Sequence, residues 1–139
     1  MKILIAVCVT ALLTAVSSAW AGGPARVKFT WDGGEAVAEL DGGAAAESLL
    51  AMLPLTLDFE DFNGTERIAY TPEKPDTSGA PESYTPKAGD ITIYAPWGNI
   101  AVFYRPFRES RGLVPLGRFV EGADKISTLG KGVRIEAME

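Results

Sequence analysis

The sequence predicts a mainly β protein, a closed antiparallel β-barrel of about eight short strands with one or two short capping helices. Three observations predict this fold class. Apolar and polar residues alternate over several short runs, as in residues 26–31, which is typical of half-buried strands. Turn residues such as Asn63-Gly64 separate these runs. Strands do not alternate with long helices, and closing the barrel would remove exposed sheet edges.

A hairpin is predicted at the start of the domain, with strands over residues 26–31 and 36–40 joined by a glycine-rich turn. The Gly42-Gly43 pair breaks this pattern. Residues 44–53 then favour a helix, because their leucines form an apolar stripe at helical spacing. Pro54 ends this helix, since the residue before a proline disfavours helical backbone.

A second hairpin is predicted where Asn63-Gly64 joins residues 55–60 to residues 66–70. Residues 71–89 carry four prolines and no periodicity. We interpret them as an ordered surface loop, with a functional loop as the alternative. The remaining expected elements are strands over residues 90–95, 99–105, 113–120 and 133–138, a polar loop at 105–111 and a short helical turn at 123–129.

Residues 1–21 have the pattern of a signal peptide. Lys2 precedes an apolar run over residues 3–16, and the segment that ends at Ala21 has the small-x-small pattern of a cleavage site. The apolar run is too short for a helix that spans a membrane, although a retained anchor helix is the alternative. We therefore expect cleavage after Ala21, a periplasmic or secreted location, and one domain over residues 22–139.

The residue types missing from the expected mature chain exclude several kinds of chemistry. The only cysteine of the sequence, Cys8, lies in the leader, so the mature chain has none. The sequence also has no histidine and no glutamine. Catalysis by Ser-His-Asp or Cys-His groups is excluded, as is metal binding by histidine or thiolate, and we predict no metal and no cofactor. Without the leader, 12 basic residues face 18 acidic ones. This balance argues against non-specific binding of nucleic acid, and we expect no membrane contact after leader removal.

Several motifs of the domain are similar to those of a known family. They occupy residues 53–57, 63–69, 88–91, 94–105 and 112–118. The most specific is the Pro-Trp-Gly-Asn turn at residues 96–99, which is followed by a Phe-Tyr-Arg sequence. On these motifs, nearly the whole of residues 22–139 resembles the small bacterial cyclophilin-like domain family. The resemblance implies a cyclophilin-like β-barrel capped by helices, and it implies no settled activity.

The true peptidyl-prolyl isomerases of this fold carry motifs that this sequence lacks. These are a Phe-His-Arg stretch, a Phe-Met-x-Gln-Gly-Gly stretch and a later histidine around the proline pocket. Because the sequence contains no histidine and no glutamine, no other position can supply these side chains. We therefore predict no catalytic residue from the resemblance.

Residues 94–105 supply the candidate binding surface. Aromatic side chains would provide apolar contact, Asn99 would orient a ligand by hydrogen bonding, and Arg105 would hold an anion or a carbonyl group. The alternative is that the aromatic rings belong to the barrel core and that Arg105 is a paired residue at the rim. The predicted ligand-binding residues are Glu66, Tyr94, Trp97, Asn99, Phe103, Tyr104 and Arg105.

Two other groups of charged side chains remain open to a functional interpretation. Four arginines between residues 105 and 118 form either an anion site or a solvated loop with surface ion pairs. The carboxylates of Asp58, Glu60 and Glu66 fall beside the second hairpin. We interpret them as the solvent-exposed face of a strand instead of an acid–base pair.

Three hypotheses about function follow. The first is an exported, non-catalytic binding module for a small molecule or an extended, proline-containing peptide. The second is a divergent peptidyl-prolyl isomerase, in which an arginine beside an apolar slot would favour the twisted amide and lower a barrier of about 18–20 kcal/mol. The third is a structural or partner-binding protein without a functional pocket. The sequence does not predict the oligomeric state.

Overall fold

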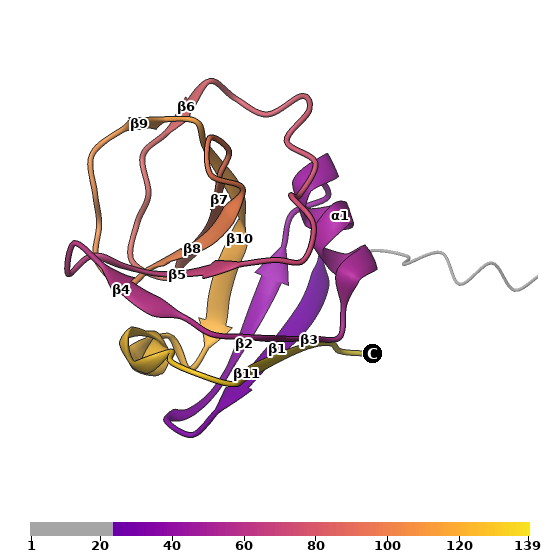
Figure 1. The fold of residues 1–139 in the computed structure, drawn as a ribbon, viewed down its shortest axis with the longest axis vertical. Coiled ribbons are helices and arrows are strands. Elements are labelled where there is room, and N and C mark those ends of the chain that lie inside the picture. Colours follow the sequence, from indigo (N-terminus) through magenta and orange to yellow (C-terminus); the bar gives the residue numbers. More distant parts are fainter. Residues whose placement is uncertain (1–23) are drawn as a thin grey trace, which may run out of the picture.

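One strongly curled antiparallel sheet dominates residues 24–139, which are the residues that the computed structural model describes. Its nine strands are β1 (Ala25–Trp31), β2 (Gly34–Leu40), β3 (Leu55–Leu57), β4 (Glu60–Phe62), β5 (Glu66–Tyr70), β7 (Asp90–Tyr94), β8 (Asn99–Phe103), β10 (Leu113–Glu121) and β11 (Val133–Ala137). They lie in the order β3-β11-β1-β2-β10-β7-β8-β5-β4 (Figure 1). The predicted mainly β class is confirmed. The predicted signal peptide at residues 1–21 falls outside the described residues.

The sheet is a curled half-barrel, so the prediction of a closed barrel is wrong. Its two edge strands, β3 and β4, are consecutive in sequence and are separated only by Asp58 and Phe59. These two residues leave the strand because they form hydrogen bonds with the loop before β11. Phe59 N donates to Gly130 O at 2.8 Å, and Asp58 Oδ1 accepts from Gly132 N at 2.8 Å. The strand predicted over residues 55–60 is therefore interrupted, and its two parts lie on opposite edges of the sheet.

The inner face of the curled sheet carries the main hydrophobic core. Alternate residues of β7 and β8 contribute to it, including Ile91, Ile93 and Ile100, none of which is exposed. Phe29 packs edge-on against Phe119, with 5.0 Å between the ring centroids. Because neighbouring strands supply their apolar residues to the same side, burial on this face fixes the register of the sheet.

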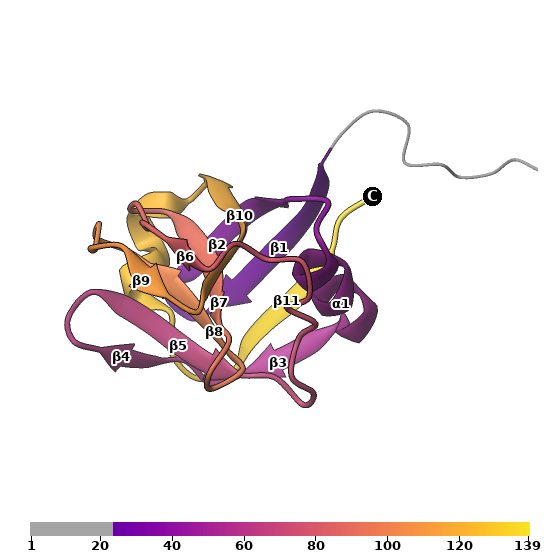
Figure 2. The ribbon, with the colours of Figure 1, turned by 90° about the horizontal axis from the view of Figure 1, so that it is seen from above.

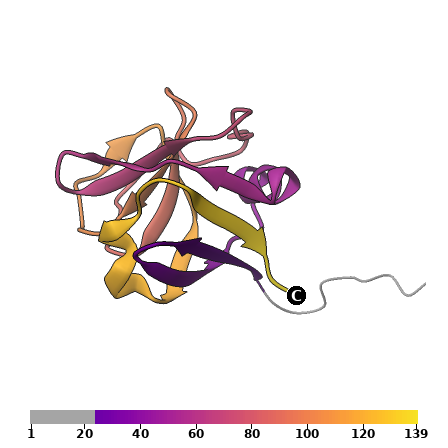
Figure 3. The same cartoon turned by 60° about the horizontal axis from the view of Figure 1, so that its bottom comes forward.

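Two short helical segments flank the sheet, as the sequence predicts. Helix α1 (Ala44–Met52) buries Ala45, Ala46 and Leu49 against the core. The 3₁₀ helix η1 (Ala123–Thr128) lies beside the tip of the β1–β2 hairpin (Figure 3). Trp31 Nε1 donates there to Thr128 Oγ1 at 3.0 Å. Within residues 24–139, neither helical segment has the length and apolar character that crossing a membrane requires.

A second, two-stranded sheet covers part of the outer face of the large one. It pairs β6 (Ser83–Tyr84) with β9 (Ser110–Arg111), and Figure 2 shows this pair from above. Buried Asp90 fixes β6 in place, because its Oδ2 accepts from the Tyr84 hydroxyl at 2.6 Å and from Lys87 N at 2.8 Å. Neither strand is predicted from the sequence, since a two-residue strand is too short to show periodicity.

Candidate functional site

The outer face of the sheet carries the candidate site, and strand β8 shows how the two faces separate. All five residues of β8 are buried. Ile100 and Val102 belong to the main core, whereas Ala101 and Phe103 belong to a second, smaller apolar cluster with Leu113. Successive side chains of a strand point to opposite faces. Asn99 therefore lies on the same outer face as Ala101 and Phe103.

A cleft of about 430 Å³ opens on this outer face. Side chains of β5, β7, β8 and β10 line it, together with the turn after β7, the end of β4 and residues 107–111. The lining residues are Phe62, Asn63, Glu66, Ile68, Tyr94, Trp97, Asn99, Phe103, Phe107, Arg108, Glu109, Ser110, Arg111 and Leu113. Five of the seven predicted ligand-binding residues thus lie together, from Glu66 on β5 to Phe103 at the end of β8.

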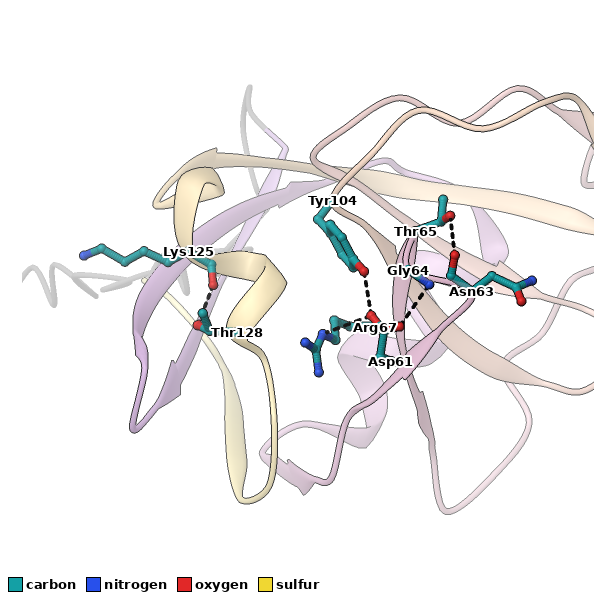
Figure 4. A network of polar contacts seen from close by, with 8 residues as sticks. All are labelled: Asp61, Asn63, Gly64, Thr65, Arg67, Tyr104, Lys125 and Thr128. Carbon is teal, nitrogen blue, oxygen red and sulfur yellow. Dashed lines mark hydrogen bonds and ion pairs between the residues drawn. The ribbon is translucent and has the colours of Figure 1, made fainter.

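The other two predicted residues, Tyr104 and Arg105, do not line the cleft. Tyr104 contacts the main core, and its hydroxyl donates to Asp61 Oδ1 at 2.6 Å on the opposite face of the sheet (Figure 4). Arg105 is exposed and lies after the end of β8, with its guanidinium carbon 5.8 Å from the Tyr104 ring centroid. Arg105 therefore does not join Trp97 and Phe103 in this cleft, contrary to the expected grouping.

Three aromatic rings form a corner of the cleft. Trp97 meets Phe62 with 5.7 Å between centroids and a 90° interplanar angle, and it meets Tyr94 at 5.4 Å and 79°. The turn that presents Trp97 is closed by hydrogen bonds from Trp97 N and Gly98 N to Tyr94 O. Gly98 adopts a φ of +71°, which a glycine reaches without steric cost. Trp97 is 47% exposed, so a large apolar side chain remains open to solvent at the cleft.

Glu66 is the acidic group at the base of this corner. It pairs across the sheet with Phe62 on one side and with Phe103 on the other, so the three side chains lie in one row. Its carboxyl group makes no hydrogen bond or ion pair within the described residues 24–139. Burial raises the pKa of Glu66 to about 7, and the nearby charge of Asp61 adds to this rise. Near neutral pH, Glu66 can therefore either donate or accept a hydrogen bond.

Asn99 supplies a second polar group in the cleft. It is only 1% exposed, and its Nδ2 donates to Ile100 O at 3.1 Å. Its Oδ1 is buried and has no donor among residues 24–139. An unsatisfied buried acceptor costs about 1–3 kcal/mol, and such groups are usually satisfied by a water molecule or a ligand.

Residues 107–111 form the rim of the cleft, and the sequence analysis did not assign them to the site. Phe107 stacks on Phe103 with 6.4 Å between centroids, and the Arg108 guanidinium lies 5.0 Å from the Phe107 ring centroid. The Ser83 hydroxyl donates to Glu109, which ties the rim to β6. A phenylalanine inside an otherwise polar segment was the sequence signal for this role. Of the four arginines grouped in the sequence analysis, only Arg108 and Arg111 line the cleft.

A second hollow, of about 690 Å³, lies beside the start of β1 and helix α1. It is lined by Pro24, Ala25, Arg26, Leu40, Asp41, Gly42, Glu47, Leu50 and Ala137. This hollow borders Pro24, the first described residue, and none of the buried polar atoms that lack a partner lies in its lining. Within the described part of the chain, no three acidic side chains gather closely enough to hold a metal ion. The outer cleft is therefore the stronger candidate site.

Comparison with known proteins supports the fold. A solution structure of a hypothetical protein from Archaeoglobus fulgidus is similar, with a TM-score of 0.66, 18% identity, and coverage of 84% of this chain and 97% of that chain. No curated protein matches. The sequence profile of the Cyclophilin-like family matches residues 29–136, which confirms the resemblance predicted from the motifs. The chain belongs to the Cyclophilin-like family.

Proposed function

We propose that this protein is an exported, non-catalytic binding module that takes a small molecule or an extended peptide in its outer cleft. One observation carries the proposal: the cleft combines open aromatic surface with two polar groups, Glu66 and Asn99, whose acceptor oxygens have no donor within residues 24–139. Ligand sites are commonly apolar hollows with a few polar groups that fix orientation.

A ligand screen by thermal shift tests the binding role. We expect ligands that raise the unfolding temperature of the wild type to lose that effect in Trp97→Ala, because Trp97 is exposed and lines the cleft. Val120→Ala is the matched control, since Val120 is also an exposed apolar residue, 40% exposed, but does not line the cleft. Ligands that respond equally to both substitutions would show that they bind elsewhere.

The exported location rests on the signal peptide predicted at residues 1–21. Expression of the full chain with fractionation of the cells tests it. We expect mature protein outside the cytoplasm, with Gly22 as its first residue by mass spectrometry. Protein that stays in the cytoplasm and keeps Met1 would contradict export.

Prolyl isomerisation is the second candidate function, favoured by the apolar rings of the cleft and by Arg108 and Arg111 at its rim. A guanidinium near the prolyl nitrogen would favour the twisted amide. Since Arg105 lies outside the cleft, one of these two arginines would have to act. A protease-coupled assay with a proline peptide tests this role, with Arg108→Ala and Arg111→Ala as variants. A rate no higher than the uncatalysed one would contradict this second function.

A further inference from the structure

The outer cleft offers hydrogen-bond acceptors without donors. Asn99 Oδ1 is buried and unpartnered among residues 24–139, and the carboxyl group of Glu66 has no partner in the same part of the chain. The pairing of β5 with β8 places both residues on one face, Glu66 opposite Phe103 and Asn99 opposite Tyr70. A ligand that satisfies Asn99 Oδ1 and the ionised carboxylate of Glu66 must therefore bring its own donors.

The aromatic corner narrows the chemistry of those donors. Trp97 packs edge-on against both Phe62 and Tyr94, and these three rings line the same cleft as Glu66. Ring faces attract cations, and aromatic walls with a nearby carboxylate are typical of sites for organic ammonium groups. A neutral donor would gain the hydrogen bond to Glu66 but not the attraction to the rings.

The charged groups around Glu66 are arranged consistently with a cationic ligand. Asp61, on the neighbouring strand β4, lies on the opposite face of the sheet; its charge adds to the rise in the pKa of Glu66, although Arg67 Nε lies 3.7 Å from it. Glu109 on the rim is acidic as well, although it accepts a hydrogen bond from Ser83. Arg108 and Arg111 are the basic groups of the lining. They and Glu109 are all exposed, so water and salt screen these three charges, and half-buried Glu66 is the charged group of the lining that is least screened.

From these contacts we infer that the cleft binds an organic cation, namely a protonated amine attached to an apolar group, with the nitrogen at Glu66 and the apolar group against Trp97. This inference rests on the proposed binding function and names its ligand class. The ammonium group donates to the carboxylate of Glu66. The apolar part covers the exposed ring of Trp97 and removes it from water.

Titration with matched probes tests the ligand class. The probes are phenethylammonium, phenylpropionate and phenethyl alcohol, which share one aromatic group and differ in charge. Binding is followed by the NMR shifts of Ile68, Ala101 and the Trp97 indole, all at the cleft or its apolar cluster. We expect phenethylammonium to bind at least about tenfold more tightly than either other probe.

Two variants and one control assign the effect to the named side chains. Glu66→Gln keeps the shape of the side chain and should weaken phenethylammonium binding about tenfold. Trp97→Leu keeps an apolar group but removes the ring, and should weaken binding by about threefold. Glu121→Gln makes the same charge change at the far end of β10, outside the cleft, and should leave the affinity unchanged.

The pH dependence gives an independent readout. An alkylammonium stays charged to about pH 9, whereas Glu66 loses its proton near neutral pH. Affinity should therefore rise several-fold between about pH 6 and about pH 8 in the wild type and stay constant in Glu66→Gln.

The possible results separate the ligand class from the proposed function. If phenylpropionate or phenethyl alcohol shifts the cleft resonances at equal or lower concentration than phenethylammonium, the cationic ligand class is wrong and the binding function stands. If phenethylammonium binds with an affinity that Glu66→Gln does not change, the assignment to Glu66 is wrong. If none of the three probes shifts any cleft resonance, both the ligand class and the binding role of the cleft are contradicted.

Discussion

Two carboxyl groups of the β4–β5 hairpin, those of Asp61 and Glu66, have opposite surroundings on opposite faces of the sheet. Asp61 accepts from the Tyr104 hydroxyl at 2.6 Å and from Gly64 N at 2.9 Å, and Arg67 Nε lies 3.7 Å from it (Figure 4). Glu66 has no such partner among residues 24–139. The Tyr104 and Gly64 hydrogen bonds lower the pKa of Asp61, whereas burial raises that of Glu66 to about 7.

The difference is informative because it reverses the usual relation between burial and pairing. Charged groups that leave water are normally paired, and exposed ones need no partner. Here the exposed carboxylate is paired, and the half-buried one is not. The partners of Asp61 all come from the hairpin and from the residue after β8, so its role is to stabilise that junction. Glu66 contributes no comparable stabilisation, which is expected of a group that binds something outside the chain.

The largest expected effect is a loss of stability when the apolar cluster beneath the cleft is disrupted. It tests whether the cleft is preformed. Phe103 is 2% exposed, and it packs with Ala101 and Leu113 beneath the cleft. Phe103→Ala should lower the free energy of unfolding by about 3–4 kcal/mol, measured by urea titration. Phe107→Ala removes the half-buried partner ring and should cost about 1–2 kcal/mol. Equal losses would mean that the outer cluster is not an ordered core and that the cleft is not preformed.

The next effect concerns Glu66 itself. Because its pKa in the folded state lies above the ordinary value of 4.5, the folded state binds more protons between about pH 4.5 and about pH 7. Stability therefore falls as the pH rises through this range. Glu66→Gln removes this loss. We expect the variant to be more stable than the wild type by about 1–2 kcal/mol at about pH 8, and equally stable at about pH 4.

Urea unfolding at both pH values measures this difference, and Glu121→Gln controls for the change in net charge. A wild type that is more stable than Glu66→Gln at the higher pH would mean that Glu66 has a stabilising partner. The contrast with Asp61 would then disappear.

Removing a hydrogen-bond partner of Asp61 should lower stability, by less than Glu66→Gln raises it. Tyr104→Phe removes the hydroxyl that donates to Asp61 and should lower the urea midpoint at neutral pH, by less than Glu66→Gln raises it. The folded pKa of Asp61 lies below its ordinary value. Its stabilising contribution is therefore complete above about pH 4 and is lost as the pH falls through the folded pKa. The midpoints of wild type and Tyr104→Phe should converge in acid, and a constant difference would indicate a packing effect.

The sequence predicted the parts of the fold that repeat a pattern. The strands predicted at β1, β5 and β8 agree with the observed bounds within two residues, and the predicted helix agrees with α1 within one. The interruption at Asp58 and Phe59 was missed because the apolar alternation continues through it. The cause of the break is a set of hydrogen bonds to Gly130 and Gly132, which lie far away in the sequence.

The candidate site was predicted in part for the same reason. Asn99 and Phe103 lie on one face of β8 and line the cleft, as alternation along a strand requires, and their role in ligand binding stays a prediction. The rim at residues 107–111 depends on a pairing with β6 from the proline-rich loop, and nothing in the local sequence indicates that contact. The sequence also does not predict that Glu66 lacks an ion-pair partner, because several arginines lie close to it in the sequence. Only the tertiary structure shows that none of the arginines among residues 24–139 pairs with it.

The smallest expected effect is that of Arg105→Ala. This variant distinguishes the site predicted from the sequence, which includes Arg105, from the cleft in the structure, which does not. The sequence predicts that Arg105 holds the polar group of a ligand, whereas in the structure Arg105 lies outside the cleft and against the Tyr104 ring. We therefore expect the free energy of unfolding to change by less than about 0.5 kcal/mol, as is usual for an exposed residue. The amide shifts of Ile68 and Ala101 should stay as in the wild type. Displacement of those shifts would place the Arg105 guanidinium at the cleft, and the polar anchor of the site would then be shared between Arg105 and Glu66.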